Sequence, residues 1–289
     1  MKRKVYCLGF FDSLHRGHRK VFEEGRMLAN RLNTELCVLT FGDGIYKALG
    51  KADKEIFLLR ERMELLQKEG IEVIVLPARR DFLDKSPEEF LSSLDDLHAA
   101  AFVTGSDYRF GKNASGDVTL LKEHFEKTDV YVSICPLLSE NGKKISTTDI
   151  RNYLSEGNVS TANGLLGFTY FISGTVVGGF RNGRLIGIPT ANVDFEEDKF
   201  IPANGVYVTK TTVKGSTYIS VSNVGNHPTF GDSHVNLETH LLDYDGDIYG
   251  ENIKVEFYEY LRGIKSFSSV DDLKNQITFD IDCARRYFL

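Results

Sequence analysis

The sequence predicts an α/β protein in two parts: a parallel sheet with helices on both faces, then an antiparallel β-barrel with a C-terminal helix. In the first half, short apolar runs alternate with stretches of helical periodicity, which is typical of strands joined by helical crossovers. Beyond about residue 160, glycines separate short β-branched runs, as they do in barrels. The chain of 289 residues is long enough for two domains with cores of their own.

Five apolar runs of the first half have the length and composition of parallel strands. They are Val5–Phe10, Glu35–Phe41, Ile71–Leu76, Ala100–Thr104 and Val130–Cys135. Parallel strands need right-handed crossovers, which place helices on the faces of the sheet. Because ligands in such sheets bind beyond the carboxyl ends of the strands, we expect the chemistry in the loops that follow these runs.

Helical spacing occurs between those runs. In the first helix, Val21, Gly25, Leu28 and Leu32 share one face. In the second, the shared face consists of Leu59, Met63 and Leu66, and we expect this helix to end at Gly70. Ser86 begins a capping box with proline at the first helical position, so a helix should start there. A further short helix fits Lys122–Lys127.

The second half reads as short strands and one final helix. The strands are Val206–Thr209, Thr217–Val221 and Ile253–Phe257, and Lys214-Gly215 is a hairpin signal between the first two. Apolar residues from Val270 to Ala284 share one helix face behind a cap at Ser268 or Ser269. We expect domains over residues 1–157 and 169–289. The residues between them, 158–168, belong to a stretch rich in Gly, Asn and Ser that we expect to be a linker.

The charge balance excludes some classes of partner. With 35 Lys and Arg against 41 Asp and Glu, the chain carries a net charge of −6, which argues against a broad nucleic-acid or membrane-binding face. No apolar run reaches the ~18 residues of a membrane span, and we expect no signal peptide. The four cysteines form no Cys-x-x-Cys pair, so buried thiols in a reducing cytoplasm are favoured over a zinc or disulfide site.

The first candidate site follows the first strand. His15 and His18 are three residues apart at a helix start, so they should face the same way, where free N–H groups and the dipole favour an anion. Gly17 between them leaves room for a phosphate near the backbone. Two capping histidines or part of a metal site are the alternatives, although no third ligand lies near in sequence.

Two further segments suit the same site. Three hydroxyls precede a helix expected over residues 149–156, those of Ser146, Thr147 and Thr148, and Arg151 on this helix adds a positive charge. Together these groups form either a second anion site or a simple N-cap cluster. The loop over residues 104–112 places aromatic rings beside Asp107 and Arg109. That composition suits a flat heteroaromatic ligand, or a surface loop with rings packed beneath it.

A second candidate site lies in the barrel half. Thr190 and Asn192 are two apart, so in a strand they face the same side, and their hard oxygen donors suit Mg²⁺. Glu238 could take a proton from an attacking alcohol. A simple turn and an exposed strand carboxylate are the alternatives. Upstream, glycines and arginines that include Gly178, Gly183 and Arg184 could form a flap over a polyphosphate.

Taken together, these segments resemble the bacterial bifunctional riboflavin kinase/FMN adenylyltransferase family, over nearly the whole chain. His-x-Gly-His after the first strand resembles the ATP-binding motif of nucleotidylyltransferases, and Ile145–Arg151 looks like the family's Ile-Ser-Ser-Thr-x-x-Arg motif. The likeness extends through Gly105–Gly111, Gly174–Asn192, Pro202–Tyr207, Asn223–Phe230, Glu238 and Asp243–Gly250 to Leu261-Arg262. It implies a Rossmann-like nucleotidylyltransferase domain followed by a riboflavin kinase barrel.

The resemblance implies two steps that use ATP with Mg²⁺. The barrel would phosphorylate riboflavin to FMN, with Glu238 as base and with Thr190 and Asn192 holding the metal and the nucleotide. The first domain would join FMN to AMP, giving FAD and pyrophosphate. Its nucleotide-binding residues would be Gly9, Phe10, His15, Gly17, His18, Ser146, Thr147, Thr148 and Arg151, with His15, His18 and Arg151 catalytic. Asp107, Arg109 and Arg262 would contact flavin.

Three positions depart from the family's pattern. Ser13 stands where glycine is usual, Gly178 replaces a histidine of the kinase flap, and residues 41–45 replace Phe-x-Pro-His-Pro after the second strand. Such changes also fit a paralogue that has kept one activity, for example FMN adenylyltransferase alone, or a flavin-binding protein without turnover. A nucleotidylyltransferase acting on another ester would leave the second half unexplained. The kinase residues are all present, so we expect both activities. The sequence does not indicate the oligomeric state.

Overall fold

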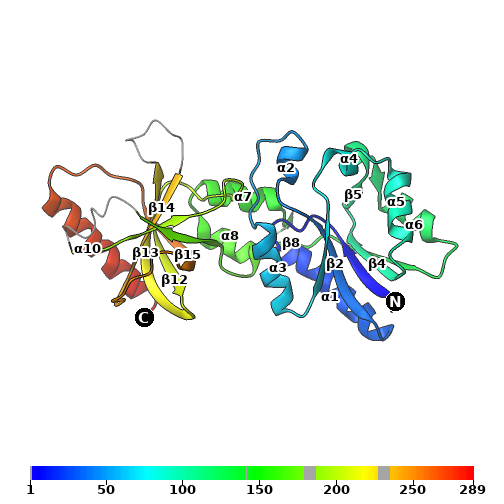
Figure 1. Ribbon diagram of the computed structural model, residues 1–289, viewed down its shortest axis with the longest axis horizontal. Coiled ribbons are helices and arrows are strands. Elements are labelled where there is room, and N and C mark those ends of the chain that lie inside the picture. Colours follow the sequence, from blue (N-terminus) through cyan, green and yellow to red (C-terminus); the bar gives the residue numbers. More distant parts are fainter. Residues whose placement is uncertain (1, 141, 179–186, 227–234) are drawn as a thin grey trace. The chain divides into compact units, whose positions relative to one another are not determined.

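The protein divides into two compact units, residues 1–147 and 148–289. The structure, a computed structural model, describes residues 2–140, 142–178, 187–226 and 235–289 (Figure 1). Each unit is built around its own sheet, as the change of period along the sequence predicts.

The first unit contains a five-stranded parallel sheet with the order β3-β2-β1-β4-β7. The strands are β1 (Lys4–Leu8), β2 (Glu35–Phe41), β3 (Glu72–Leu76), β4 (Ala99–Gly105) and β7 (Tyr131–Cys135). The chain builds outward from β1 to β3 and then returns to the other side of β1 at β4, so the switch point lies between β1 and β4. The parallel sheet predicted from the sequence is confirmed.

Helices cover both faces of this sheet. They are α1 (Arg16–Arg31), α2 (Ile45–Ala48), α3 (Leu59–Lys68), α4 (Arg80–Leu83), α5 (Pro87–Asp95) and α6 (Val118–Phe125). On one face α1 packs against β1, where the Cys7 thiol donates to the Val21 carbonyl. On the other face α5 and α6 pack over Tyr6 and Phe102 through a cluster that includes Phe90 and Leu121. The expected two-sided arrangement is therefore confirmed.

One helix of the first unit starts at a different residue from the one predicted. The helix expected over Lys122–Lys127 is α6, which begins earlier because the Asp117 carboxylate caps it by accepting from the amides of Thr119 and Leu120. Short hairpins follow β4 and β7. They consist of β5 (Arg109–Phe110) with β6 (Gly116–Asp117), joined through the 3₁₀ turn Lys112–Ala114, and of β8 (Ser139–Glu140) with β9 (Lys143–Lys144).

Two helices precede the barrel. They are α7 (Thr147–Ser155), which starts two residues before the predicted helix, and α8 (Val159–Leu166). The residues expected to form a linker, 158–168, thus contain a packed helix. The Asn158 side chain caps α8, and the apolar face of this helix is buried. The Asn163 side chain donates to the carbonyl of Phe257 in the barrel.

The second unit is a closed antiparallel barrel with the order β10-β11-β14-β13-β12-β15. Its strands are β10 (Phe171–Val177), β11 (Ala191–Asp194), β12 (Gly205–Val213), β13 (Ser216–Asn226), β14 (Val235–Leu241) and β15 (Asn252–Arg262). The predicted Lys214-Gly215 hairpin turn joins β12 and β13, and both residues have positive φ, +49° and +80°. The barrel expected from the sequence is confirmed.

The barrel interior contains five hydroxyls that hydrogen-bond in a closed ring. Around the ring they are Thr209, Ser220, Thr211, Thr239 and Ser222, each fully buried, with oxygen–oxygen distances of 2.8 to 3.2 Å. Each hydroxyl can donate one hydrogen bond and accept one, so the ring satisfies all five without water. Because it joins β12, β13 and β14, the ring favours one register of these strands over a slipped one.

The chain closes with α10 (Val270–Tyr287), which packs on the outer surface of β12 and β13. The Ser269 hydroxyl accepts from the Asp272 amide and caps the helix, as predicted. Ala284 is fully buried against an apolar cluster that includes Val206 and Val221. The outer face of this part of the barrel is therefore covered by a helix.

A pair of glycine substitutions tests the packing of the barrel unit. A Cβ at Gly174 would lie 2.2 Å from the backbone oxygen of Asp194, whereas a Cβ at Gly164 on α8 would meet nothing within 4 Å. We expect Gly174→Ala to lower the free energy of unfolding by about 2–4 kcal/mol, because β10 and β11 must separate. Gly164→Ala should raise it by about 0.5–1 kcal/mol.

Thermal and urea unfolding followed by circular dichroism would measure both effects. A Gly174→Ala variant as stable as Gly164→Ala would contradict the close approach of β10 and β11.

Candidate active sites

The loop after β1 places two histidines at the start of α1. His15 is the N-cap residue, and its Nδ1 accepts a hydrogen bond from the His18 amide at 3.1 Å. The two rings stack with their centroids 3.6 Å apart, which confirms that the side chains face the same way. Because Nδ1 of His15 is an acceptor, its proton lies on Nε2, which is left as a donor.

Burial keeps both imidazoles neutral. It lowers the pKa of His15 to about 4 and the pKa of His18 well below its ordinary value, and the nearby charge of Lys144 acts in the same direction. The Nδ1 atom of His18 is buried and has no hydrogen-bond partner among the described residues. A buried polar atom without a partner, next to a helix N-terminus, fits a site that a ligand completes.

The two glycines of this loop are required by neighbouring rings. A Cβ at Gly17 would lie 2.9 Å from the imidazole of His15, and one at Gly9 would lie 2.7 Å from the ring of Phe11. Gly17 therefore makes space for the histidine itself, in addition to any phosphate. Phe11 and Leu14 supply the tight turn between them, with φ values of +53° and +48°.

The second predicted motif meets this loop within the first unit. The Ser13 hydroxyl lies 2.9 Å from the Thr147 hydroxyl, and Ser13 is fully buried. Thr147 is the first residue of α7, and Ser146 and Thr148 flank it. The structure thus brings the segments after β1 and β9 together, as expected for partner loops. Arg151, on α7 in the second unit, lies with its guanidinium 6.0 Å from the ring of Phe200, and its role stays a prediction.

Lys144 is a charged neighbour of this site that the sequence analysis missed. Its ammonium pairs with the carboxylate of Asp107, and it lies near enough to lower the pKa of both histidines. The signal available in the sequence was its position one residue ahead of the Ile145–Arg151 motif. Arg109 lies 3.6 Å from the carboxylate of Asp117 and is half exposed. Flavin contacts by Asp107 and Arg109 stay predictions.

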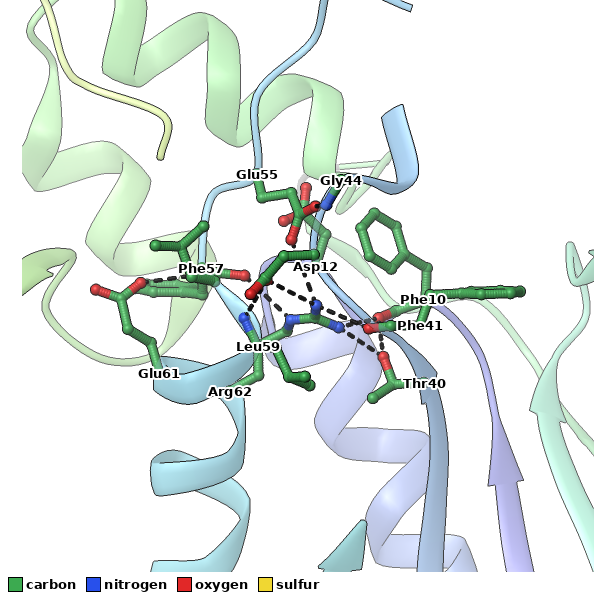
Figure 2. Close-up of polar contacts among 12 residues, drawn as sticks. Phe10, Asp12, Thr40, Phe41, Gly44, Glu55, Phe57, Leu59, Glu61 and Arg62 are labelled. Carbon is green, nitrogen blue, oxygen red and sulfur yellow. Dashed lines mark hydrogen bonds and ion pairs between the residues drawn. The ribbon is translucent and has the colours of Figure 1, made fainter. Parts of the chain in front are cut away.

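A buried cluster of charged groups lies beside the β1 loop (Figure 2). Glu55 accepts from the Gly44 amide at 2.7 Å and lies 3.4 Å from the guanidinium of Arg62. Burial raises the pKa of Glu55 to about 8. Arg62 opposes this shift, while the carboxylates of Asp43 and Asp12 add to it. Glu55 is therefore mostly protonated at neutral pH, although it lies beside an arginine.

In the barrel, strand register aligns the second group of predicted residues. Reading across five strands, Asn192 pairs with Glu238, Glu238 with Asn223, Asn223 with Val206, and Val206 with Arg262. Paired residues of neighbouring strands point to the same face, and this face is the outer one, opposite the hydroxyl ring. The chain thus forms one row of side chains from Asn192 on β11 to Arg262 on β15.

Asn236 connects two members of this row and was not found by sequence reasoning. Its Nδ2 donates to Asn192 Oδ1 at 3.2 Å and to Glu238 Oε1 at 2.9 Å. It precedes Glu238 by two residues in β14, so the period of two was the signal that could have found it. The amide holds the proposed metal ligand and the proposed base in one arrangement.

His240 fixes the segment that leads into β11. Its Nδ1 lies 2.7 Å from the carbonyl of Pro189, which can only accept, so Nδ1 carries a proton. Thr190 follows directly. The hydroxyl of Thr190 and the amide oxygen of Asn192 are neutral hard donors of the kind that Mg²⁺ prefers when phosphates supply the negative charge. The residues present fit a metal that arrives with its nucleotide.

A cavity of about 620 Å³ lies along this row, between the outer face of the barrel and α10. Glu238, Asn223 and Arg262 line it, and apolar side chains form much of the remaining wall. Asp280 of α10 holds Arg262 through both carboxylate oxygens, the shortest contact being 2.7 Å. A smaller cavity of about 70 Å³ shares Thr190 as a lining residue and is flanked by residues 244–249.

The remaining predicted residues are the three flap positions Gly178, Gly183 and Arg184 and the cysteines. Gly178 lies just beyond β10, where an added Cβ would meet no atom of the described residues within 4 Å, and Gly183 and Arg184 lie outside the described residues. Cys7, Cys37 and Cys135 are buried, as expected, and burial raises the pKa of all three thiols, whereas Cys283, on α10, is only partly buried. In the ranges that the structure describes, no helix is long and apolar enough to cross a membrane, and no group of three or more His, Cys, Asp or Glu side chains could hold a metal.

Comparison with known proteins identifies the family. Residues 1–149 match the family described as FAD synthetase, and residues 166–288 match the family described as riboflavin kinase. A protein of Listeria monocytogenes named bifunctional riboflavin kinase/FMN adenylyltransferase is 34% identical and is aligned over 99% of this chain and 92% of its own length. The chain belongs to this bifunctional family.

Two other proteins show the same extent of similarity. The bifunctional riboflavin kinase/FMN adenylyltransferase of Bacillus subtilis is 34% identical, over 99% of this chain and 93% of its own. A crystal structure from Streptococcus pneumoniae, titled as a macrolide-efflux protein, is 32% identical with a TM-score of 0.89 and covers 98% of this chain and 94% of that one. Both likenesses extend over the two units, so the family resemblance read from the motifs is confirmed.

Within the family, one of the three departures has a structural explanation. Ser13 does not occupy a left-handed conformation, so a side chain fits there, and its hydroxyl bonds Thr147. At Gly178 a Cβ would meet no atom of the described residues within 4 Å, and nothing in the described structure explains the change from histidine. The segment at residues 41–45 joins the buried cluster around Arg62.

The raised pKa of Glu55 predicts a dependence of stability on pH. A carboxyl whose pKa is raised on folding stabilises the fold fully below its unfolded pKa, and this contribution is lost as the pH rises through the folded value of about 8. Glu55→Gln removes this titration. Between about pH 5 and about pH 9 the wild type should therefore lose about 4 kcal/mol more stability than Glu55→Gln.

Urea unfolding across that pH range would measure the difference. Glu64→Gln, on the exposed face of the adjacent helix α3, is the matched control. A wild type and Glu55→Gln with parallel stability curves would show that Glu55 ionises normally.

Proposed function

We propose that the chain makes FAD from riboflavin in two ATP-dependent steps, with the kinase in residues 169–289 and the adenylyltransferase in residues 1–157. The observation that carries the proposal is that one chain of this family builds two different sites. One is the outward row from Asn192 to Arg262 beside a cavity of about 620 Å³. The other is the stacked histidine pair at the start of α1.

In the kinase step, the ribityl 5′-hydroxyl of riboflavin attacks the γ-phosphorus of ATP, and ADP leaves. Glu238 accepts the hydroxyl proton, and Asn236 keeps its carboxylate aligned. Thr190 and Asn192 hold the nucleotide with its Mg²⁺. Support for this arrangement comes from the two cavities that share Thr190, since the larger one, of about 620 Å³, has the volume and the largely apolar wall that suit a flat ring system, and Arg262 lies in that wall.

In the adenylyl step, a phosphate oxygen of FMN attacks the α-phosphorus of ATP, and pyrophosphate leaves with its Mg²⁺. His15 and His18 begin as neutral donors, because burial depresses their pKa values, and the incoming triphosphate favours their protonation. The hydroxyls at residues 146–148 and the cation of Arg151 balance the charge that develops on the leaving group. Positioning and electrostatics are sufficient for such a transfer, with no covalent enzyme intermediate.

A chain with only one of the two activities is the competing function. The altered segment at residues 41–45 favours the loss of adenylylation, while FMN adenylyltransferase alone would require an inactive kinase site. An inactive kinase site is disfavoured because Asn236 holds Glu238 and Asn192 together. A non-catalytic flavin binder would not need that arrangement either. The net charge of −6 supports small-molecule substrates over nucleic acid or membrane partners.

The deciding experiment incubates the apoprotein with riboflavin, ATP and Mg²⁺ and separates the flavins by chromatography. We expect FMN first and then FAD. FMN without FAD would indicate a kinase alone, FAD from added FMN only would indicate an adenylyltransferase alone, and neither product would refute the proposal.

Two substitutions test the division of labour. Glu238→Gln should lower FMN formation by at least ~100-fold, because the general base is lost, while added FMN is still converted to FAD. His18→Ala should lower FAD formation by a similar factor and leave FMN formation intact. Steady-state rates of each half-reaction measure both effects. Equal loss of both activities in either folded variant would contradict separate sites.

A further inference from the structure

Arg62 is a fully buried arginine that the two proposed reactions do not use. It extends from α3, and Figure 2 shows its guanidinium among groups from several segments. Its Nη1 donates to the Phe10 carbonyl at 3.1 Å and to the Thr40 hydroxyl at 2.6 Å, and its Nη2 donates to the Phe41 carbonyl at 3.0 Å. Its Nε donates to the carbonyl of Phe57 at 3.0 Å. One side chain thus ties the ends of β1 and β2 to α3.

The network around Arg62 contacts the loop after β1, residues 9–15, at the carbonyl of Phe10. This loop, which carries the proposed nucleotide-binding residues, is called the nucleotide loop below. The Phe10 carbonyl accepts from the Thr40 hydroxyl at 2.5 Å as well as from Arg62, and the guanidinium also lies 5.1 Å from the centre of the Phe10 ring. Five residues further along, His15 begins α1. The intervening backbone has two residues in the left-handed region, so its direction depends on how its first peptide is held.

The same network holds the segment that departs from the family. Asp43 accepts from the Leu59 amide at 2.5 Å and lies 3.8 Å from Arg62, and Gly44 donates to Glu55. Asp12, in the nucleotide loop, accepts from the Ile56 amide at 2.8 Å and from the Tyr46 hydroxyl at 3.0 Å. Arg62 therefore links the altered segment to the loop after β1, and Asp12 ties that loop to Tyr46, next to the segment, and to Ile56.

We propose that Arg62 is a positioning residue for adenylyl transfer, which aligns the nucleotide loop and the altered segment after β2 without touching substrate. This rests on the adenylyltransferase activity proposed above. The altered segment then does not imply a silent first site, because buried polar bonds around Arg62 give it a defined position.

The chemistry of the side chain explains why arginine is needed here. The planar guanidinium directs donors from three nitrogens at fixed angles, and here they reach acceptors on five residues, Glu55 included. Lysine has the charge but not the geometry, so it could satisfy only part of this set. The carbonyl acceptors carry no charge of their own, and the carboxyl group of Asp43, 3.8 Å from the guanidinium, lies near enough to compensate the cation.

Four variants of the full chain test the proposal. Arg62→Lys removes the geometry and keeps the charge. Thr40→Val removes the hydroxyl that bonds both Arg62 and Phe10, whereas Thr40→Ser retains it. Glu64→Gln on the exposed face of α3 is the control. For each, kcat and KM for ATP are measured in the conversion of FMN to FAD, at a temperature where circular dichroism shows the folded state, and the riboflavin kinase rate serves as the internal reference.

We expect kcat of adenylylation to fall ~100-fold in Arg62→Lys and ~10-fold in Thr40→Val, with KM for ATP changed by less than ~3-fold, because misalignment affects the transition state more than binding. Thr40→Ser and Glu64→Gln should stay within ~3-fold of the wild type. The kinase rate should not change in any variant.

The outcomes separate the two proposals. An unchanged kcat in folded Arg62→Lys, even with a lowered melting temperature or a raised KM, would overturn the positioning role and leave Arg62 as a structural residue. Thr40→Ser as impaired as Thr40→Val would also overturn it, because the hydroxyl would then not matter. A wild type that makes no FAD from FMN would instead refute the adenylyltransferase function itself.

Discussion

The barrel site depends on strand register, because the same β-strands supply a buried core on one face and the reactive groups on the other. Inside, five hydroxyls close a ring across β12, β13 and β14. Outside, the paired residues form the row that contains Asn192 and Glu238. A slip by one residue would turn Thr239 outward and Glu238 into the core, so the fold and the chemistry select the same register.

The first unit meets the same requirement with different means. Its reactive groups lie on loops at the carboxyl ends of parallel strands, where no ladder of hydrogen bonds fixes them. Side chains take over that role: the His15 imidazole caps α1, the Ser13 hydroxyl bonds Thr147, and Arg62 binds carbonyls at the ends of β1 and β2. In the first unit, side-chain hydrogen bonds beneath the loops therefore hold the candidate site residues in place. In the barrel, backbone pairing between strands does the same for the row from Asn192 to Arg262.

The five parallel strands, the barrel strands β12, β13 and β15 and the helix α10 could be predicted from local signals, since they have clear periods and recognisable turns and caps. The barrel strands β10, β11 and β14 and the helix α8 were not predicted individually. The histidine pair and the Thr190, Asn192 and Glu238 set could be found because short spacing brings them to one face. Asn236 and Lys144 were missed because their importance lies in contacts with groups distant in the chain. Arg62 was missed for a related reason: a charged residue on an amphipathic helix normally faces water, and only tertiary packing shows that this one is buried.

One further consequence concerns Thr190, which borders both the large and the small cavity of the barrel unit. A side chain that forms part of two adjoining compartments cannot be exchanged to suit one occupant without altering the other. In the proposed kinase, preference for the phosphoryl donor and preference for the acceptor alcohol are therefore linked at this position, and any drift in one during evolution would have to be compensated at residues that face a single compartment.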